Sequence, residues 1–197
     1  MTGQQRGEET RSNILGAALK CFGQRGYEAT GVAEICKRAG VTKGAFYYHF
    51  PSKQAVFLEL FNRWLEGISK QLAEARSEAT GVPEGLLRMA DKAQGVFDAA
   101  GGQLTMFLEF WSEAQHDAVI RKVILAPYRR YRDYFSEIIR AGIEEQTLKP
   151  VDPDVAAEVV VSLAVGLVLQ GVLDPKGADW GKTARNAIQI LLEGLQK

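Results

Sequence analysis

Apolar residues recur at intervals of three and four along most of the chain, and no stretch shows the strict alternation of a half-buried strand. Spacing by three and four is the period of an α-helix, whereas alternation is the period of a strand. The pattern therefore predicts an all-α protein. The predicted helices span about residues 10–24, 32–39, 43–49, 52–74, 84–99, 103–115, 118–146, 154–173 and 179–195.

Two of these helices, 32–39 and 43–49, are short and close together. Gly40 stands where glycine commonly ends a helix, and Thr42 is a good N-cap for the helix that follows. Two short helices joined by a Gly-containing turn form a helix-turn-helix, whose second helix can enter a major groove of DNA. The sequence thus predicts a helix-turn-helix DNA-binding domain over residues 1–53.

The predicted second helix presents side chains suited to DNA. Lys43 could reach the O6 and N7 atoms of guanine, and the run Tyr47, Tyr48 and His49 can donate hydrogen bonds to phosphates or base edges. Gly44 has no side chain, so DNA could approach the backbone of this helix closely. In the alternative interpretation, the tyrosines only stack on neighbouring helices and His49 is a hydrogen-bonded packing residue.

The charge distribution agrees with a DNA-binding N-terminal part. The whole chain carries 24 Lys and Arg against 24 Asp and Glu. Residues 1–53 carry eight Lys or Arg against four Glu, so the surplus of four positive charges there is balanced by a surplus of four negative charges in the remainder. A basic first quarter on a mildly acidic body is typical of a small polyanion-binding module attached to a domain with another task.

Several short motifs fall in register with a known family. They are Gly26-Tyr27, Thr30, Val32-Ala-Glu-Ile35, Ala39-Gly-Val-Thr-Lys-Gly-Ala-Phe-Tyr-Tyr-His-Phe50 and Ser52-Lys53. This segment resembles the DNA-binding domain of TetR/AcrR-type transcriptional regulators. The resemblance implies a homodimer that binds a palindromic operator, usually represses transcription, and carries a helical C-terminal domain for a small molecule.

The same resemblance assigns DNA contacts by matching position. The residues are Thr30, Thr42, Lys43, Gly44, Tyr47, Tyr48, His49 and Lys53. Gly31 departs from the family pattern, which often has Ser or Thr there as a helix N-cap, and this removes one hydroxyl contact to phosphate. In the alternative interpretation, Thr42 is only a helix cap.

Residues 54–197 are predicted to form a helical effector-binding and dimerisation domain. Phe107-Leu-Glu-Phe-Trp-Ser-Glu-Ala114, Tyr128-Arg-Arg-Tyr131 and Gly166-Leu-Val-Leu-Gln170 resemble the C-terminal domain of the BetI-type subgroup. Large apolar side chains exceed what a small helical core requires, so some are expected to line an apolar cavity. The candidates are Trp64, Met89, Phe97, Met106, Phe107, Phe110, Trp111, Tyr128 and Tyr131. Alternatively, these side chains simply fill the core at helical spacing.

The stretch from Val155 to Leu173 is apolar almost throughout and long enough to span a membrane. Its polar interruptions and amphipathic surroundings argue against that, and no membrane partner is expected. A helix that is apolar on all sides has to be covered on both sides, here by its own domain and by a partner subunit. We therefore expect a homodimer through the helices at about 154–173 and 179–195.

Catalytic and metal chemistry find little support. Glu113 and His116 have the spacing of a di-iron ligand pair, but such a site needs a second histidine, and the other histidine is His49. No Gly-x-Ser-x-Gly elbow is present. No metal, cofactor or catalytic residue is therefore predicted. Cys21 and Cys36 are expected to be small core residues of a protein in the reducing cytoplasm.

The sequence therefore predicts a DNA-binding transcriptional regulator, a repressor released by a small, largely apolar effector. Two alternatives stay open at this stage. One is a helical enzyme or small-molecule binding module that uses the C-terminal cavity, and the other is a DNA-binding protein without an effector. The identity of the effector, the operator and the regulated genes does not follow from the sequence, nor does the choice between repression and activation.

Overall fold

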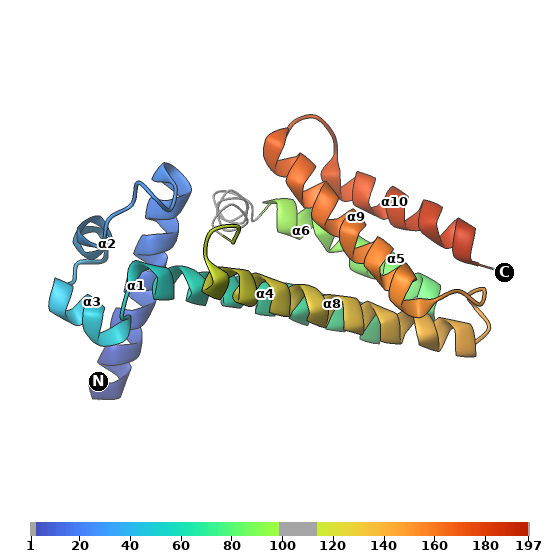
Figure 1. Cartoon of the computed structure of the whole chain (residues 1–197), viewed down its shortest axis with the longest axis horizontal. Coiled ribbons are helices and arrows are strands. Elements are labelled where there is room, and N and C mark those ends of the chain that lie inside the picture. The colour runs from blue at the N-terminus through green and yellow to red at the C-terminus, as the bar shows by residue number, and fades with distance from the viewer. Residues whose placement is uncertain (1–2, 99–113, 197) are drawn as a thin grey trace. The chain divides into compact units, whose positions relative to one another are not determined.

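The computed structural model describes residues 3–98 and 114–196, and these residues are helical apart from turns, loops and one isolated bridge between Leu148 and Gln196. The all-α prediction is confirmed. The helices in Figure 1 are α1 (Gly3–Arg25), α2 (Val32–Ala39), α3 (Lys43–His49), α4 (Lys53–Ser77), α5 (Val82–Asp91), α6 (Ala93–Asp98), α8 (Ala118–Glu144), α9 (Pro153–Leu173) and α10 (Trp180–Leu195). Most of the helix predicted at 103–115 lies outside the described residues.

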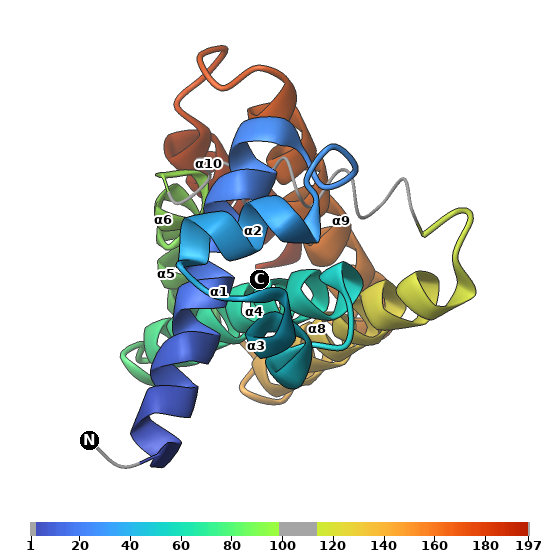
Figure 2. The ribbon, with the colours of Figure 1, turned by 90° about the vertical axis from the view of Figure 1, so that its left-hand side faces the viewer.

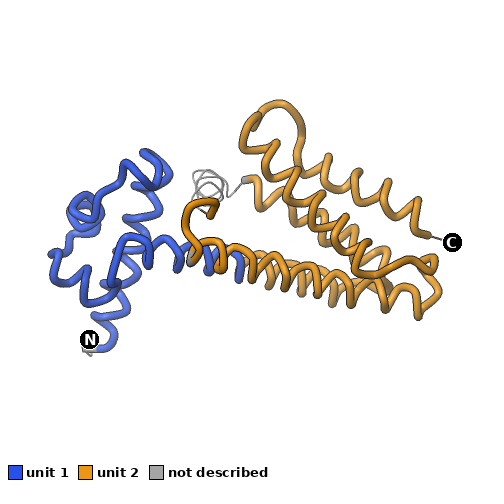
Figure 3. Tube along the Cα trace, viewed as in Figure 1, with its two compact units in different colours: residues 1–66, 101–110 blue, residues 67–100, 111–197 orange. Residues whose placement is uncertain are grey.

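The chain divides into two compact units, coloured separately in Figure 3. Unit 1 comprises residues 1–66 and 101–110, and unit 2 comprises residues 67–100 and 111–197. Helix α4 continues from unit 1 into unit 2 without interruption.

Unit 1 is built on an aromatic and aliphatic core. In Figure 2 helices α2 and α3 lie in front of α1, and all three pack on one another. The ring centroid of Phe57 on α4 lies 5.7 Å from that of Phe22 on α1 and 4.7 Å from that of Tyr27. The fully buried or nearly buried apolar residues here are Ile14, Leu15, Ala17, Ala18, Cys21, Phe22, Ile35, Cys36, Phe46, Phe50, Val56, Phe57, Phe61 and Leu65.

The turn between α2 and α3 follows from two local signals. Gly40 adopts φ 67°, in the left-handed region that glycine enters without a steric penalty, and its N–H donates to the carbonyls of Cys36 and Lys37. Thr42 has extended backbone, and its Oγ1 accepts a hydrogen bond of 3.1 Å from the N–H of Ala45. These two caps fix the end of α2 and the start of α3 where the sequence places them.

Unit 2 packs α8 against α9, and α10 against α5, α6 and α9. Gly142 on α8 permits a close approach, because a Cβ there would lie 2.7 Å from Leu148 Cδ1. The N–H of Lys149 donates to the carbonyl of Leu195 over 2.7 Å, which fixes the end of α10. The core of unit 2 consists of Ala75, Val82, Leu86, Met89, Phe135, Ile138, Ile139, Leu148, Ala156, Ala157, Val160, Val161 and Leu192.

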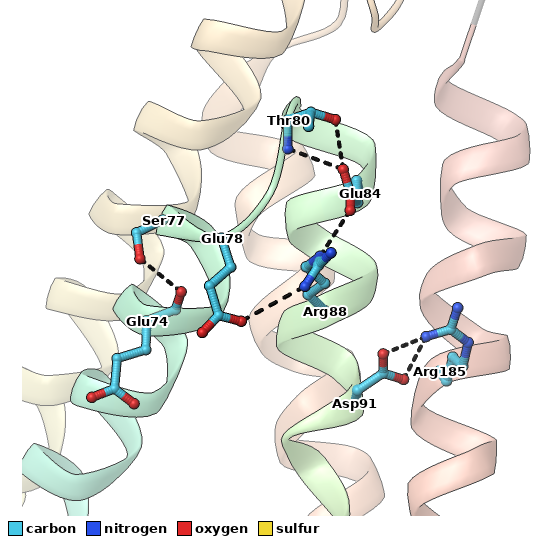
Figure 4. Close-up of polar contacts among 8 residues, drawn as sticks. All are labelled: Glu74, Ser77, Glu78, Thr80, Glu84, Arg88, Asp91 and Arg185. Carbon is cyan, nitrogen blue, oxygen red and sulfur yellow. Dashed lines mark hydrogen bonds and ion pairs between the residues drawn. The ribbon is translucent and has the colours of Figure 1, made fainter.

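A polar network ties the start of α5 to its neighbours (Figure 4). Glu84 accepts hydrogen bonds from the N–H and Oγ1 of Thr80, at 3.0 and 2.6 Å, and from Arg88 Nε at 2.8 Å. The hydrogen bonds from Thr80, joined by the Arg88 guanidinium, lower the pKa of Glu84 to about 2. Arg88 also pairs with Glu78 at 3.6 Å.

Two predicted helix boundaries need correction. Helix α1 begins at Gly3, about two turns before the predicted start. The prediction missed these turns because they are polar and show no apolar period. The helix predicted at 84–99 is instead two helices, α5 and α6, separated at Lys92. By contrast, α8 continues through Pro127 as one helix, as predicted.

Candidate nucleic-acid interface

Helix α3 separates a buried anchor from an exposed aromatic surface. Phe46 is 0% exposed and lies 6.2 Å from the Phe50 ring, centroid to centroid. Tyr47 and Tyr48, directly after it, are 53% and 85% exposed. A tyrosine with both ring and hydroxyl in solvent can stack on a partner and donate a hydrogen bond to it. The helix therefore presents two uncovered aromatic donors.

The first turn of α3 is exposed as well. Lys43 and Gly44 both lie in solvent, next to the capping residue Thr42. Because Thr42 Oγ1 accepts from the N–H of Ala45, its own O–H proton is left to donate outward. The helix thus offers a cation and a hydroxyl donor at one end, with no side chain at Gly44 to block a close partner.

His49 ends α3 in a half-buried position. Its ring lies edge-on to Tyr48, with centroids 5.0 Å apart. A Cβ placed on Gly7 of α1 would lie 3.9 Å from His49 Cε1, so the imidazole lies close to the early part of α1. His49 therefore has one side packed and one side toward solvent.

Thr30 and Lys53, also predicted to contact DNA, are engaged within unit 1. Thr30 is buried, and its Oγ1 donates to the carbonyl of Gly26 over 2.7 Å. Lys53 Nζ donates to the carbonyl of Tyr27 over 2.8 Å and lies 4.1 Å from the centroid of its ring. Both side chains hold the loop before α2, and their assignment as DNA contacts stays a prediction. Gly31 caps α2 without a side-chain hydrogen bond.

The predicted ligand-lining residues are spread over the two units. Trp64 belongs to unit 1, where its ring lies 6.1 Å from that of Phe61. In unit 2, Met89 is part of the core, and Phe97 lies 6.3 Å from the ring of Trp180. Met106, Phe107, Phe110 and Trp111 lie outside the described residues.

Tyr128 and Tyr131 of α8, both predicted to line a cavity, are half-buried against the core of unit 2. The Tyr131 hydroxyl and Ser69 Oγ on α4 share a hydrogen bond of 3.0 Å. This bond joins the part of α4 that belongs to unit 2 directly to a candidate ligand-lining side chain.

The described part of the chain holds no group of three or more His, Cys, Asp or Glu residues that could bind a metal. Glu113, half of the possible di-iron pair, lies outside that part. Cys21 and Cys36 are buried free thiols within the core of unit 1.

Helices α9 and α10 carry aliphatic side chains in solvent. Val155, Val159, Leu169 and Leu173 repeat at helical intervals on α9, and Ile190 is exposed on α10. By length and composition alone α9 is also long and apolar enough to cross a membrane. Its other side, including Ala157, Val160 and Val161, is buried in the core of unit 2.

Two family models match the sequence. Residues 14–60 match the model for bacterial regulatory proteins of the tetR family, and residues 84–197 match that for the C-terminal domain of BetI-type transcriptional repressors. The HTH-type transcriptional regulator AcrR of Shigella flexneri is 30% identical in an alignment that covers 96% of this chain and 91% of that protein.

Solved structures share the fold. A transcriptional regulator from Saccharomonospora viridis in complex with choline aligns with a TM-score of 0.84 at 22% identity, over 96% of this chain and 99% of that one. The regulator FadR from Bacillus subtilis in complex with stearoyl-CoA aligns with a TM-score of 0.81 at 20% identity, over 93% of this chain and 98% of that one.

Proposed function

The chain belongs to the tetR family of DNA-binding transcriptional regulators, with a BetI-type C-terminal domain, and on this premise we propose that it is a repressor. In this proposal a homodimer binds a palindromic operator and releases it when a small, largely apolar effector binds. The family consists of regulators and not of enzymes, so the catalytic alternative is set aside. Residues 1–53 are assigned to DNA binding, residues 54–197 to effector binding and dimerisation, and the site of action to the cytoplasm.

The observation that carries the proposal is the exposed surface of α3. A seven-residue helix held by the buried Phe46 leaves Lys43, Tyr47 and Tyr48 in solvent. A helix of this kind fits into the major groove, where lysine binds guanine acceptors and tyrosine hydroxyls bind phosphates or base edges. Thr42, Gly44 and His49 complete this surface, which we call the reading surface.

The exposed aliphatic residues of α9 and α10 support the homodimer. Apolar side chains in solvent at Val155, Val159, Leu169, Leu173 and Ile190 have a free-energy cost of about 25 cal/mol per Å² of apolar surface. A second copy of the chain would cover them as a four-helix bundle across a twofold axis. The same symmetry would give two reading surfaces for the two halves of a palindrome.

Effector release is proposed to act through α4. This helix supplies residues to both units, and Ser69 in its second half is hydrogen-bonded to Tyr131. An effector that displaces Tyr131 would shift α4 and change the spacing of the two reading surfaces. Only a difference in effector affinity between the DNA-bound and released states can drive such a change.

Ligands bound to two structural neighbours suggest which classes of effector to test. The choline and stearoyl-CoA complexes of the two neighbours involve a quaternary ammonium compound and a long acyl chain. Aromatic side chains such as Tyr128 and Tyr131 can accept either kind of ligand, since they attract cations and bury hydrocarbon. An effector screen on this protein therefore includes both classes.

The experiment that tests the function is selection of bound sequences from random duplex DNA. The recovered site is then titrated at several salt concentrations. We expect a palindrome with half-sites about one helical turn apart or somewhat more, and a steep loss of affinity with salt. Recovery of no preferred sequence by folded, dimeric protein would overturn the proposal of a specific operator.

A further inference from the structure

The first two turns of α1 form a polar extension that the core of unit 1 does not explain. Residues 4–9 are exposed apart from the half-buried Gly7, and the first buried residue of α1 is Ile14. These turns begin the 23-residue helix α1 and expose only glutamine, arginine and glutamate side chains. The extension therefore presents polar and charged side chains, and no apolar face, to a partner.

The extension lies beside α3. The ring of His49, the last residue of α3, is within van der Waals reach of a Cβ placed on Gly7. Figures 1 and 2 both show the first turns of α1 running past α3 toward the N-terminus. A duplex held by the reading surface would pass close to these turns.

Arg6 is the cation that this extension presents. Among the arginines of residues 3–66, it alone has an exposed guanidinium without a hydrogen bond or ion pair, while Thr10 Oγ1 donates to its carbonyl over 2.8 Å. The others are engaged within unit 1: Arg11 and Arg63 with Glu59, Arg25 with Glu34, and Arg38 with Gln24.

The direction of Arg6 on the helix also suits an external partner. At about 100° per residue, Arg6 and Glu8 leave α1 on opposite flanks. Arg11 lies on the same side of the helix as Glu8, and its guanidinium forms an ion pair with Glu59 on α4 at 2.9 Å. The flank of Arg6 is therefore turned away from α4. Of the two nearby glutamates, Glu9 leaves the helix on the side closer to Arg6, about 60° away around the axis.

We propose that Arg6 binds a DNA phosphate beside the groove that α3 enters, so that the start of α1 is a second DNA contact of this protein. The inference rests on the proposed function, since it needs α3 on an operator. A guanidinium suits this role because its five donors can bind a phosphate bidentately, and binding releases condensed counterions from the duplex.

The test compares variants on the duplex recovered by selection, across a series of salt concentrations. Arg6→Ala is expected to weaken binding about tenfold and to reduce the slope of log K against log salt by about 1 for each protomer bound. Arg6→Lys should retain most of the affinity. Glu9→Gln should tighten binding about twofold, because it removes a negative charge near the phosphates. Thermal unfolding of all variants should match that of the unchanged protein.

Lys20→Ala is the matched control, because Lys20 is an exposed cation on the same helix about 21 Å further along. Equal losses for Arg6→Ala and Lys20→Ala would indicate general electrostatic attraction and overturn the proposal. An unchanged affinity and salt slope for Arg6→Ala, with binding weakened by Lys43→Ala, would overturn it while leaving the proposed function intact. A loss confined to sites with A·T-rich flanks would assign Arg6 to the minor groove and overturn the phosphate contact.

Discussion

The two units differ in what they leave in solvent. Among the described residues of unit 1, the exposed large hydrophobic side chains are the tyrosines Tyr47 and Tyr48, which carry hydroxyls and lie near Lys43. Those exposed in the described part of unit 2 are aliphatic, and most lie on α9 and α10. Aromatic donors beside a cation suit a polar, charged partner, whereas aliphatic side chains suit only another apolar surface. The exposed side chains of unit 1 therefore favour DNA as a partner, and those of unit 2 favour another protein surface.

The largest expected effect comes from removing the anchor of the reading surface. Phe46→Ala should lower the free energy of unfolding by about 3–5 kcal/mol, because it empties a fully buried aromatic site. Denaturant titration followed by circular dichroism measures the loss, and operator binding should disappear with it. Tyr48→Ala, on the exposed side of the same helix, should change stability by less than about 0.5 kcal/mol. Similar losses for both variants would contradict the division of α3 into a buried and an exposed face.

A charged side chain introduced on α9 should disrupt the proposed dimer contact of unit 2. Val159→Glu should weaken dimerisation about 100-fold or more, because each dimer would bury two carboxylates in an apolar contact. Sedimentation velocity across a concentration series measures this change. Leu125→Glu on α8 is the matched control, since Leu125 is 41% exposed and Val159 46% exposed. A dimer unaffected by Val159→Glu would place the interface elsewhere.

Smaller effects are expected on the reading surface itself. Lys43→Ala and Tyr47→Ala should each weaken operator binding by about 1–3 kcal/mol without changing the unfolding transition, because both side chains are exposed. Fluorescence anisotropy with the selected duplex measures the affinity. Lys122→Ala removes an exposed cation of α8 and should leave binding unchanged. If both reading-surface variants bound as well as the unchanged protein, α3 would not be the DNA-reading element.

The smallest effect is a pH dependence at the start of α5. The pKa of Glu84 is lowered to about 2 from its ordinary 4.5 by the hydrogen bonds from Thr80 and Arg88. Its contribution to stability is therefore fully present above pH 4.5 and is lost as the pH falls toward 2. Thermal melts of the unchanged protein and of Glu84→Gln should differ at pH 6, and the difference should shrink as the pH falls below 4.5. A difference independent of pH would show that Glu84 does not act through its charge.

Local signals explain where the sequence predicted the fold well. The bounds of α2 and α3 agree with the structure because Gly40 and Thr42 end one helix and start the next through contacts within a few residues. The early start of α1 was missed, since residues 3–9 have no apolar period to read. The separation of α5 and α6 at Lys92 has no Gly or Pro signal at that residue.

The candidate site shows the same division between local and distant signals. The exposed side of α3 follows from helical spacing around Phe46. The hydrogen bond from Lys53 to the carbonyl of Tyr27 joins residues 26 positions apart, and the close approach of His49 to Gly7 involves residues 42 positions apart. Such pairings depend on how helices pack, so neither could be predicted from the sequence. The DNA contact that the family resemblance implies for Lys53 stays a prediction, and Arg6 entered the sequence analysis only through its charge.

The continuity of α4 has a consequence for local opening of the backbone. Unit 1 gives way to unit 2 between Glu66 and Gly67, in the middle of this helix, where no loop is available to act as a hinge. Glycine makes a helix less stable than alanine by about 1 kcal/mol, and Gly67 is exposed with open space around it. The amide protons around Gly67 should therefore exchange with solvent faster than those near the buried Phe57 and Ala75. Local opening of the helix at Gly67 would let the two units move independently. A Gly67→Ala variant, which stabilises the helix there, would couple them more tightly.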